Sequence, residues 1–316
     1  MLNFLYCFDN NYNIQASVSM YSLLEKVSEK ISIYIIHKDK HYKDQVNNNI
    51  KGHPNLKELN VYTFEEPITN FPNVENNHIS EATYYRLYIS NYLPKSLNNI
   101  VYLDADVVCL NNPVDEIKHI QKMMKDKYSV GVKTELLRQQ GTESLFKNLE
   151  MKNQKYFNAG VMIIDLNLWK KFNIEELAQT KMVSMASIIR FWDQDILNSI
   201  IDSDFLEISD NLNFIVNLAS DEEIFLDGKK TNINQNIFLH YAGSNKPWEL
   251  NGIMNFNSTY YQKNFREINF KKYHLEVKWR KLMLRQLIEN IKNFNIFKIE
   301  FTMSLFILAL KKLIKI

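Results

Sequence analysis

Two aspartates interrupt a strongly apolar segment, and their type and spacing could support metal chemistry. Asp104 and Asp106 lie within residues 101–108, where the neighbouring side chains are mostly apolar. Burying an unpaired charge is costly, and a bound cation can offset that cost. Residues two apart on an extended chain point the same way, so both carboxylates are predicted to face one hard cation, with Ala105 on the other side. Mg²⁺ or Mn²⁺ suits such oxygen ligands; the alternative is an ordinary turn with two capping aspartates.

A second polar segment, residues 240–248, follows an apolar run that is predicted to be a strand. His240 offers a third metal ligand, Gly243 would permit close backbone approach to a ligand, and Lys246 offers a point charge for a phosphate. A metal and a lysine around one diphosphate would stabilise it as a leaving group. Alone, a histidine in such a position is usually structural and a lysine is usually solvated. The prediction therefore depends on His240 and Lys246 occurring together with Asp104 and Asp106.

The glycine content of the sequence argues against nucleotide binding through a glycine-rich loop. The chain has only seven glycines, none in the turn after the first predicted strand, and it lacks the G-x-x-x-x-G-K-[ST] pattern. That turn contains Phe8, Asp9, Asn10, Asn11 and Tyr12. These residues supply polar groups and a ring at a strand's carboxyl end, where a base and ribose could bind. The alternative is a turn that only caps the following helix.

The elements that must position these residues alternate between strands and helices. Helices are predicted at residues 14–27 and 80–92, with a further polar helix after residue 37. Strands are predicted at residues 2–8, 31–37, 59–64, 100–110, 129–133, 160–166 and 236–240. The continuous apolar run at 31–37 is typical of a strand buried on both faces. Such alternation predicts an α/β fold with a mostly parallel central sheet.

The last part of the chain differs in charge. Residues 271–316 contain eleven Lys or Arg and three Glu, whereas the rest is net acidic. We therefore expect an α/β domain over residues 1–250 and a basic helical segment over 251–316. Leu284, Leu287, Ile288 and Ile291 have helical spacing. This segment could pack on the core or bind an anionic membrane, and the two can coexist; its apolar content favours lipid over nucleic acid.

Cysteine usage and the chain start predict a cytoplasmic location. Cys7 and Cys109 lie inside apolar runs, as expected for buried free thiols in a reducing compartment. No signal-peptide pattern is visible. The longest uncharged apolar stretch, residues 301–310, is shorter than the roughly 20 residues that a spanning helix needs.

Six sequence landmarks occur in the order typical of one enzyme family. They are residues 8–12, 83–87 (TYYRL), 102–106 (YLDAD), 157–161 (FNAGV), 192–195 (WDQD) and 240–248. Over residues 1–250 the chain resembles glycosyltransferase family 8, and within it the bacterial lipooligosaccharide and lipopolysaccharide galactosyltransferases and glucosyltransferases. The resemblance implies the GT-A fold, a UDP-sugar donor, dependence on Mn²⁺ or possible use of Mg²⁺, and retention of anomeric configuration.

The resemblance also implies a role for each matching residue. Asp104, Asp106 and His240 would bind the metal. The uridine end would be held by Phe8, Asp9, Asn11 and Tyr12, with Asp104 touching the ribose beside Ala105. The donor sugar and diphosphate would contact Arg86, Asn158, Asp193, Gln194, Gly243 and Lys246. Gln194 would lie near the reacting carbon, and Asp193 and Lys246 complete the predicted catalytic set.

The predicted function is transfer of galactose or glucose to a surface glycan at the inner face of the cell membrane. The basic segment would hold the protein there as a peripheral protein. Two alternatives are self-glucosylation of the glycogenin kind and a non-catalytic module that binds sugar nucleotides or membranes. Glu135 could contact an acceptor, although a surface role is the preferred interpretation.

Overall fold

The computed structural model describes residues 1–66, 71–72, 80–135, 142–218, 225–226, 229–230, 232–243 and 245–314. Its centre is a seven-stranded sheet in the order β3-β2-β1-β4-β7-β6-β8. The strands are β1 (Asn3–Phe8), β2 (Ile31–His37), β3 (Leu56–Thr63), β4 (Asn99–Leu103), β6 (Val130–Thr134), β7 (Phe157–Asp165) and β8 (Leu206–Glu207). Strand β7 is antiparallel to β4 and β6, and the other neighbouring pairs are parallel. The prediction of an α/β fold with a mostly parallel sheet is confirmed.

The sheet is buried on both faces because its strands are apolar on both. In β1, Leu5 and Cys7 enter one hydrophobic cluster, whereas Phe4, Tyr6 and Phe8 enter the other. This alternation follows from the two-residue period of a strand. Both cysteines are buried and free, and burial raises the pKa of each thiol.

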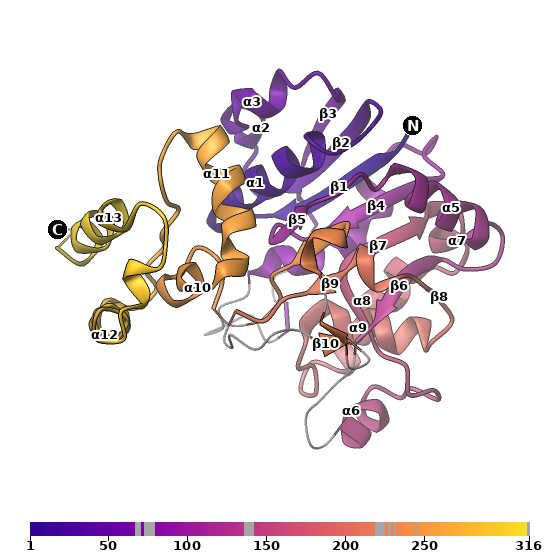
Figure 1. Ribbon diagram of the computed structural model, residues 1–316. Helices are drawn as coiled ribbons and strands as arrows, with labels where there is room; N and C mark the ends of the chain where they lie inside the picture. The colour runs from indigo at the N-terminus through magenta and orange to yellow at the C-terminus, as the bar shows by residue number, and fades with distance from the viewer. Residues whose placement is uncertain are drawn as a thin grey trace.

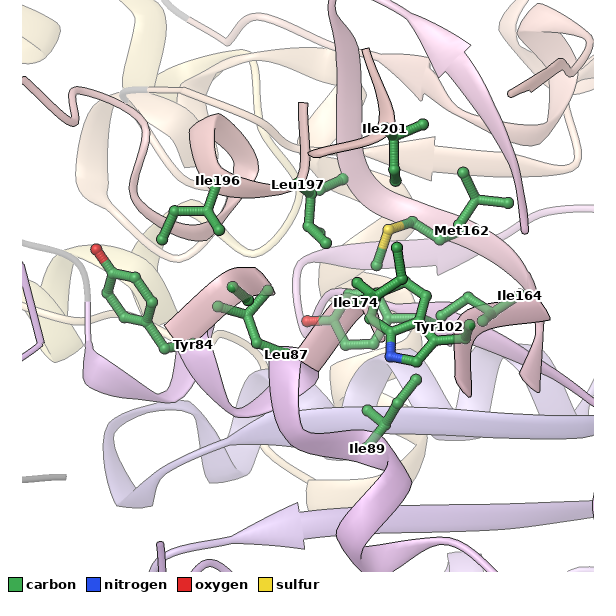
Figure 2. Close-up of a cluster of buried hydrophobic side chains, with 14 of the residues drawn as sticks. Tyr84, Leu87, Ile89, Tyr102, Met162, Ile164, Ile174, Ile196, Leu197 and Ile201 are labelled. Carbon is green, nitrogen blue, oxygen red and sulfur yellow. The ribbon is translucent and has the colours of Figure 1, made fainter. Parts of the chain in front are cut away.

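Helices cover both faces of the sheet (Figure 1). One face packs against α1 (Asn13–Leu24), α2 (Tyr42–Gln45), α3 (Asn48–Lys51) and α5 (Val114–Met124). The other packs against η2 (Glu81–Tyr88), α4 (Ile89–Tyr92), α6 (Thr142–Asn148), α7 (Leu166–Lys171), α8 (Ile174–Ser184) and α9 (Trp192–Ile201). Figure 2 shows part of this second cluster, where Leu197 of α9 and Met162 of β7 lie in one apolar layer with Tyr102 of β4. In place of the single helix predicted at 80–92, the structure has the 3₁₀ helix η2 followed by α4, which is one α-helical turn.

A second, three-stranded sheet stands beside the first. It contains β5 (Val107–Cys109), β12 (Phe238–His240) and β9 (Phe214–Ile215), with β12 in the centre. The prediction of one strand over residues 100–110 is wrong, because β4 ends at Leu103 and β5 continues in this other sheet. A turn that contains Asp104, Ala105 and Asp106 joins the two. The remaining short elements are η1 (Asn10–Tyr12), η3 (Asp210–Leu212), η4 (Ile233–Gln235), and the hairpin strands β10 (Phe225–Leu226) and β11 (Lys229–Lys230).

The chain ends in helices, as expected: α10 (Leu250–Met254), η5 (Phe256–Ser258), α11 (Thr259–Asn269), α12 (Arg280–Lys292), η6 (Asn295–Phe297) and α13 (Thr302–Ile314). Helix α11 belongs to the α/β body, since Tyr261 and Phe265 share a cluster with Trp248 and Val18. Helices α12 and α13 pack instead around a separate cluster with α10 and project to one side of the molecule (Figure 1). Within the described residues, no helix is long and apolar enough to cross a membrane.

Candidate active site

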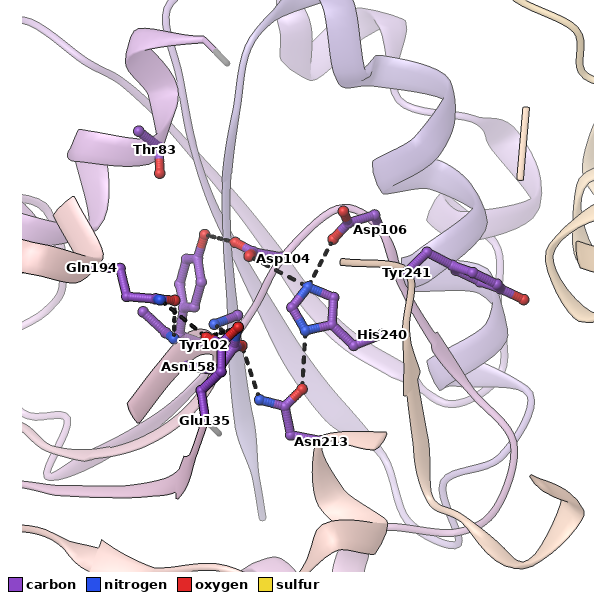
Figure 3. Close-up of polar contacts among 12 residues, drawn as sticks. Thr83, Tyr102, Asp104, Asp106, Glu135, Asn158, Gln194, Asn213, His240 and Tyr241 are labelled. Carbon is purple, nitrogen blue, oxygen red and sulfur yellow. Dashed lines mark hydrogen bonds and ion pairs between the residues drawn. The ribbon is translucent and has the colours of Figure 1, made fainter. Parts of the chain in front are cut away.

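The two predicted metal-binding carboxylates meet at the turn between the two sheets. The Asp104 amide donates to the Gly160 carbonyl oxygen at 2.8 Å, and the Val107 amide donates to the Asp104 carbonyl oxygen at 3.2 Å. The turn, and not the alternation of an extended strand, brings the side chains of Asp104 and Asp106 together (Figure 3). Ala105 lines the same cavity as both aspartates and also packs against the apolar cluster that contains Leu103 and Val107.

His240 joins the carboxylates from the last residue of β12. Its register partner in β5 is Val107, which places the ring next to Asp106. His240 Nε2 lies 3.4 Å from Asp106 Oδ1 and 3.9 Å from Asp104 Oδ2. The three ligand atoms lie within 4.8 Å of one another.

One carboxylate oxygen of Asp106 indicates whether this cluster is suited to bind a cation. Asp106 Oδ1 is buried and has no hydrogen-bond partner among the residues that the structure describes. An unsatisfied buried anionic oxygen is costly, and a bound cation would remove that cost. Two carboxylates and one imidazole therefore fit a divalent cation, and they are the residues that would hold it.

Lys246 supplies the positive charge on the other side of Asp106. Lys246 Nζ lies 2.7 Å from Asp106 Oδ2 and donates to the Tyr241 carbonyl oxygen, also at 2.7 Å. Burial alone would raise the pKa of Asp106, but nearby positive charge, led by the Lys246 ammonium group, outweighs it and lowers that pKa. The Asp106 carboxylate is therefore ionised at neutral pH, as a metal ligand must be.

Arg86 is a buried connector within the site. Its NH1 lies 3.2 Å from Asp104 Oδ1, and its Nε lies 2.7 Å from Asp193 Oδ2. NH1 also donates to the Ala159 carbonyl oxygen at 2.6 Å, and the guanidinium stacks 4.3 Å above the Tyr102 ring. Burial raises the pKa of Asp193 to about 6, although Arg86 and a hydrogen bond from Thr83 act against the rise. The geometry thus assigns Arg86 to holding Asp104 and Asp193 in place.

Three further side chains form a hydrogen-bonded group beside the carboxylates. Gln194 Oε1 accepts from the Ala159 amide at 2.9 Å, which orients its Nε2 toward Glu135 Oε2 at 3.1 Å. Asn158 Nδ2 donates to the same Glu135 oxygen at 3.1 Å. Glu135 is half-buried and bridges two predicted donor-sugar residues, so it takes part in the hydrogen bonding of the site and is not an isolated surface carboxylate.

A cavity of about 100 Å³ opens over the carboxylates, with Phe8, Tyr12 and Lys246 in its wall. Five of the lining residues are not among the site residues predicted from the sequence: Cys7, Ser80, Ala82, Thr83 and Tyr102. Asp9 accepts hydrogen bonds from the Asn11 amide at 2.9 Å and from the Ser80 hydroxyl. Asp9 and Asn11 therefore order the turn whose aromatic residues line the cavity, as the capping alternative predicted. Gly243 has φ of +88°, and a Cβ there would meet no atom within 4 Å.

The sequence matches the glycosyl transferase family 8 profile over residues 3–252, which includes every residue of this site. The chain belongs to glycosyl transferase family 8. The family expected from the six landmarks is thus confirmed, and so is the expectation that the protein is a glycosyltransferase.

Named family 8 relatives and solved structures agree with this membership. A lipopolysaccharide 1,2-glucosyltransferase of Escherichia coli is 30% identical over 271 residues, covering 83% of this chain and 76% of the relative. A lipopolysaccharide 1,3-galactosyltransferase of Salmonella typhimurium is 26% identical over 254 residues, covering 78% and 72%. The crystal structure of galactosyltransferase LgtC, with donor and acceptor sugar analogues, superposes with a TM-score of 0.68 at 19% identity, covering 89% of this chain and 99% of LgtC. That likeness confirms the GT-A fold.

Proposed function

We propose that this family 8 enzyme transfers galactose or glucose from a UDP-sugar to a lipooligosaccharide, lipopolysaccharide or related surface glycan, with retention of configuration. The observation that carries the proposal is the Asp104–Asp106–His240 cluster beside Lys246, with Asp104, Asp106 and Lys246 lining one cavity. The names of the relatives support a hexose donor and a lipopolysaccharide acceptor. They offer no support for self-glucosylation or for a non-catalytic role.

The charges of the site suit a diphosphate leaving group. A bound Mn²⁺, or Mg²⁺, would be held by Asp104, Asp106 and His240 and would neutralise developing negative charge on the diphosphate. Lys246 would add a second positive charge once a phosphate competes with Asp106 for its ammonium group. Phe8 and Tyr12 offer rings for the uridine end at the carboxyl end of β1.

The residues beside the carboxylates suit the sugar. Asn158, Gln194 and Glu135 present amide and carboxylate groups that match sugar hydroxyls. We favour attack by the acceptor hydroxyl on the same face as the departing diphosphate, because the one carboxylate in this group, Glu135, already accepts from two amides. Trapping of a glycosyl adduct on any side chain of the wild-type enzyme would overturn this route.

Hydrolysis of a panel of UDP- and GDP-sugars by the pure protein tests the proposed reaction. UDP release from one UDP-hexose, lost in EDTA and lowered at least ~10²-fold by Asp106→Asn, is the expected result. Asp126→Asn is the matched control, because Asp126 is exposed and outside the site. Absence of both turnover and UDP binding in the presence of Mn²⁺ would contradict the proposal.

We further propose that the enzyme works as a peripheral protein on the inner face of the cell membrane. Support comes from apolar side chains of α12 and α13 that remain exposed beside many basic residues. In α12 these include Leu284, Ile288 and Ile291, with Leu282 also exposed; in α13 they are Met303, Ile307, Leu310 and Ile314. Leu284, Ile288 and Ile291, and likewise Met303, Ile307, Leu310 and Ile314, recur at helical spacing and form a stripe, which is the pattern of a helix that lies in a membrane interface.

A further inference from the structure

Asn213 is a fully buried amide that lies between the metal-binding histidine and the sugar side of the site. It precedes β9, and its side chain contacts His240 of β12 and Asn158 of β7 (Figure 3). Burial of an amide without partners is costly, so its position is explained by the two hydrogen bonds that it makes. Asn213 is not among the residues predicted from the sequence, because nothing in its local sequence separates it from other asparagines of this Asn-rich chain.

The direction of each hydrogen bond can be fixed from the backbone. The Gly160 amide can only donate, and it lies 3.0 Å from Asn158 Oδ1, so that atom is an acceptor. Asn213 Nδ2 lies 3.0 Å from the same Asn158 oxygen and therefore donates to it. The remaining atom of the Asn213 amide, Oδ1, is an acceptor, and it lies 2.9 Å from His240 Nδ1. The proton of the neutral His240 ring must then be on Nδ1.

This assignment matters because the carboxylates favour the opposite tautomer. His240 Nε2 lies 3.4 Å from Asp106 Oδ1 and 3.9 Å from Asp104 Oδ2, and both oxygens would attract a proton on Nε2. A proton there would occupy the lone pair that a metal ion needs. A hydrogen-bond acceptor at Nδ1 is the arrangement that keeps Nε2 free.

We propose that Asn213 is a positioning residue that holds His240 in the Nδ1-protonated tautomer, so that Nε2 is ready to bind a divalent cation. This inference rests on the proposed metal-dependent transfer. It adds that the chain of hydrogen bonds from the Gly160 amide through Asn158 and Asn213 fixes the tautomer of the His240 ring before a metal ion binds. Asn213 itself would touch neither the ion nor the substrate.

The test is the ¹⁵N–¹H correlation spectrum of the His240 ring in metal-free protein, at a pH where the ring is neutral. His240→Gln assigns the signal among the seven histidines of the chain. Wild-type protein should show Nδ1 protonated. Asn213→Leu, of similar size but without an acceptor, should shift the ring to Nε2 protonation, whereas Asn213→Asp retains an acceptor and should keep the wild-type tautomer.

Calorimetry with Mn²⁺ in the presence of UDP gives the second readout. Asn213→Leu should weaken Mn²⁺ binding ~10- to 100-fold. The control is Asn290→Leu, which removes another buried amide, in α12, and should leave Mn²⁺ binding unchanged.

Two results would overturn the inference. One is a wild-type ring protonated on Nε2, which needs no variant to fold. The other is a folded Asn213→Leu protein with wild-type tautomer and Mn²⁺ affinity. Failure of the proposed function would appear separately, as a wild-type enzyme that releases no UDP from any sugar nucleotide while its tautomer remains measurable.

Discussion

Asp106 divides its two carboxylate oxygens between two partners. Oδ2 lies 2.7 Å from Lys246 Nζ, whereas Oδ1 faces His240 Nε2 without a hydrogen bond from any described residue. The ammonium group keeps the carboxylate ionised, and the second oxygen is left for a cation. Asp106 thus holds the ammonium group that would meet a phosphate and offers its other oxygen to the metal ion.

At the residue scale, Gly160 is predicted to be irreplaceable for metal binding. A Cβ at this position would lie 2.2 Å from His240 Cε1 and 2.8 Å from Asp104 Oδ2, so both ligands must move in Gly160→Ala. Overpacking of this kind costs about 1–3 kcal/mol of stability. We expect Mn²⁺ affinity, measured by calorimetry with UDP, to fall at least ~10-fold.

The control for this substitution is Gly52→Ala. Gly52 follows α3, far from the site in sequence, and a Cβ there would approach only the Asn48 carbonyl oxygen, at 3.3 Å. It should bind Mn²⁺ as the wild type does. Equal affinity of Gly160→Ala and Gly52→Ala would show that the ligand positions tolerate the added methyl group.

The three predicted metal ligands share a property that Asn213 lacks. Asp104, Asp106 and His240 are ionisable groups at the ends of apolar runs, and such a context is visible locally. The hydrogen-bond partners of Glu135 and Asn213 at the site lie between 23 and 59 residues away in the sequence. Those contacts depend on how the strands are ordered in the sheet, which residue type and spacing alone do not encode.

At the element scale, the apolar run at 100–110 shows what a local pattern can and cannot specify. It predicted extended, buried chain correctly, and both β4 and β5 are buried. Periodicity does not say whether two extended pieces share a sheet. The change of sheet at residues 104–106 is the feature that turns an Asp-x-Asp pair into a site.

The close contact between α10 and the Lys246 segment leads to a second prediction. A Cβ on Gly252 would lie 2.0 Å from the Lys246 carbonyl oxygen and 2.7 Å from its carbonyl carbon. Backbone atoms cannot rotate away, so Gly252→Ala must displace either the helix or Lys246. We expect weaker UDP binding, by ~10-fold or more, and a loss of about 1–3 kcal/mol of stability.

Calorimetry with UDP and thermal unfolding measure these two effects, again with Gly52→Ala as the reference variant. Mn²⁺ should be present when UDP is titrated into either variant, so that the metal site is saturated. The difference in UDP affinity between the variants then reports on Lys246. Wild-type UDP affinity in Gly252→Ala would mean that the position of Lys246 does not depend on this helix contact.

Helix α8 provides a pH-dependent prediction outside the site. Burial, with the nearby charge of Glu66, raises the pKa of Glu175 to about 7. The folded state therefore binds a proton that the unfolded state, with a pKa near ~4.3, releases. Stability from this group is then lost as pH rises from about 4.3 to about 7, and it stays constant above that range.

Glu175→Gln should remove this loss. Unfolding temperatures across pH 4 to 8 should show the variant gaining on the wild type as pH rises through this window. Glu176→Gln, which neutralises the exposed neighbouring carboxylate, is the control and should track the wild type. Parallel curves for Glu175→Gln and the wild type would indicate that Glu175 has the same pKa in both states.

At the scale of the whole molecule, helices α12 and α13 project to one side, away from β4 and β5, which flank Asp104 and Asp106 (Figure 1). The amphipathic pattern at 284–291 predicted either packing or exposure, and the structure contains both. Leu287 is buried in the cluster with α10 and α13, whereas Leu284 and Ile288 are exposed on the same helix. Helix α12 is therefore docked by one side and leaves a second apolar stripe free.

This arrangement determines how membrane binding should be tested. Removal of residues 295–316 would uncover the separate cluster, because Leu305 and Ala309 are fully buried in it. Substitution of exposed residues avoids that damage. Phe294, Phe297 and Met303 are between 62% and 68% exposed, so changing all three to serine should leave the cluster intact.

The triple variant should lose sedimentation with vesicles that contain anionic lipid and retain wild-type release of UDP from its donor. Each apolar side chain contributes about 1.5–3 kcal/mol when fully buried, so even partial insertion of three implies a loss of at least ~10-fold in partitioning. The control changes Phe172, Val183 and Phe256, which are also exposed, to serine. If both triple variants bind vesicles equally, Phe294, Phe297 and Met303 do not form the membrane contact. If only the first fails, the C-terminal helices hold the cavity next to the surface where a lipid-linked acceptor would be presented.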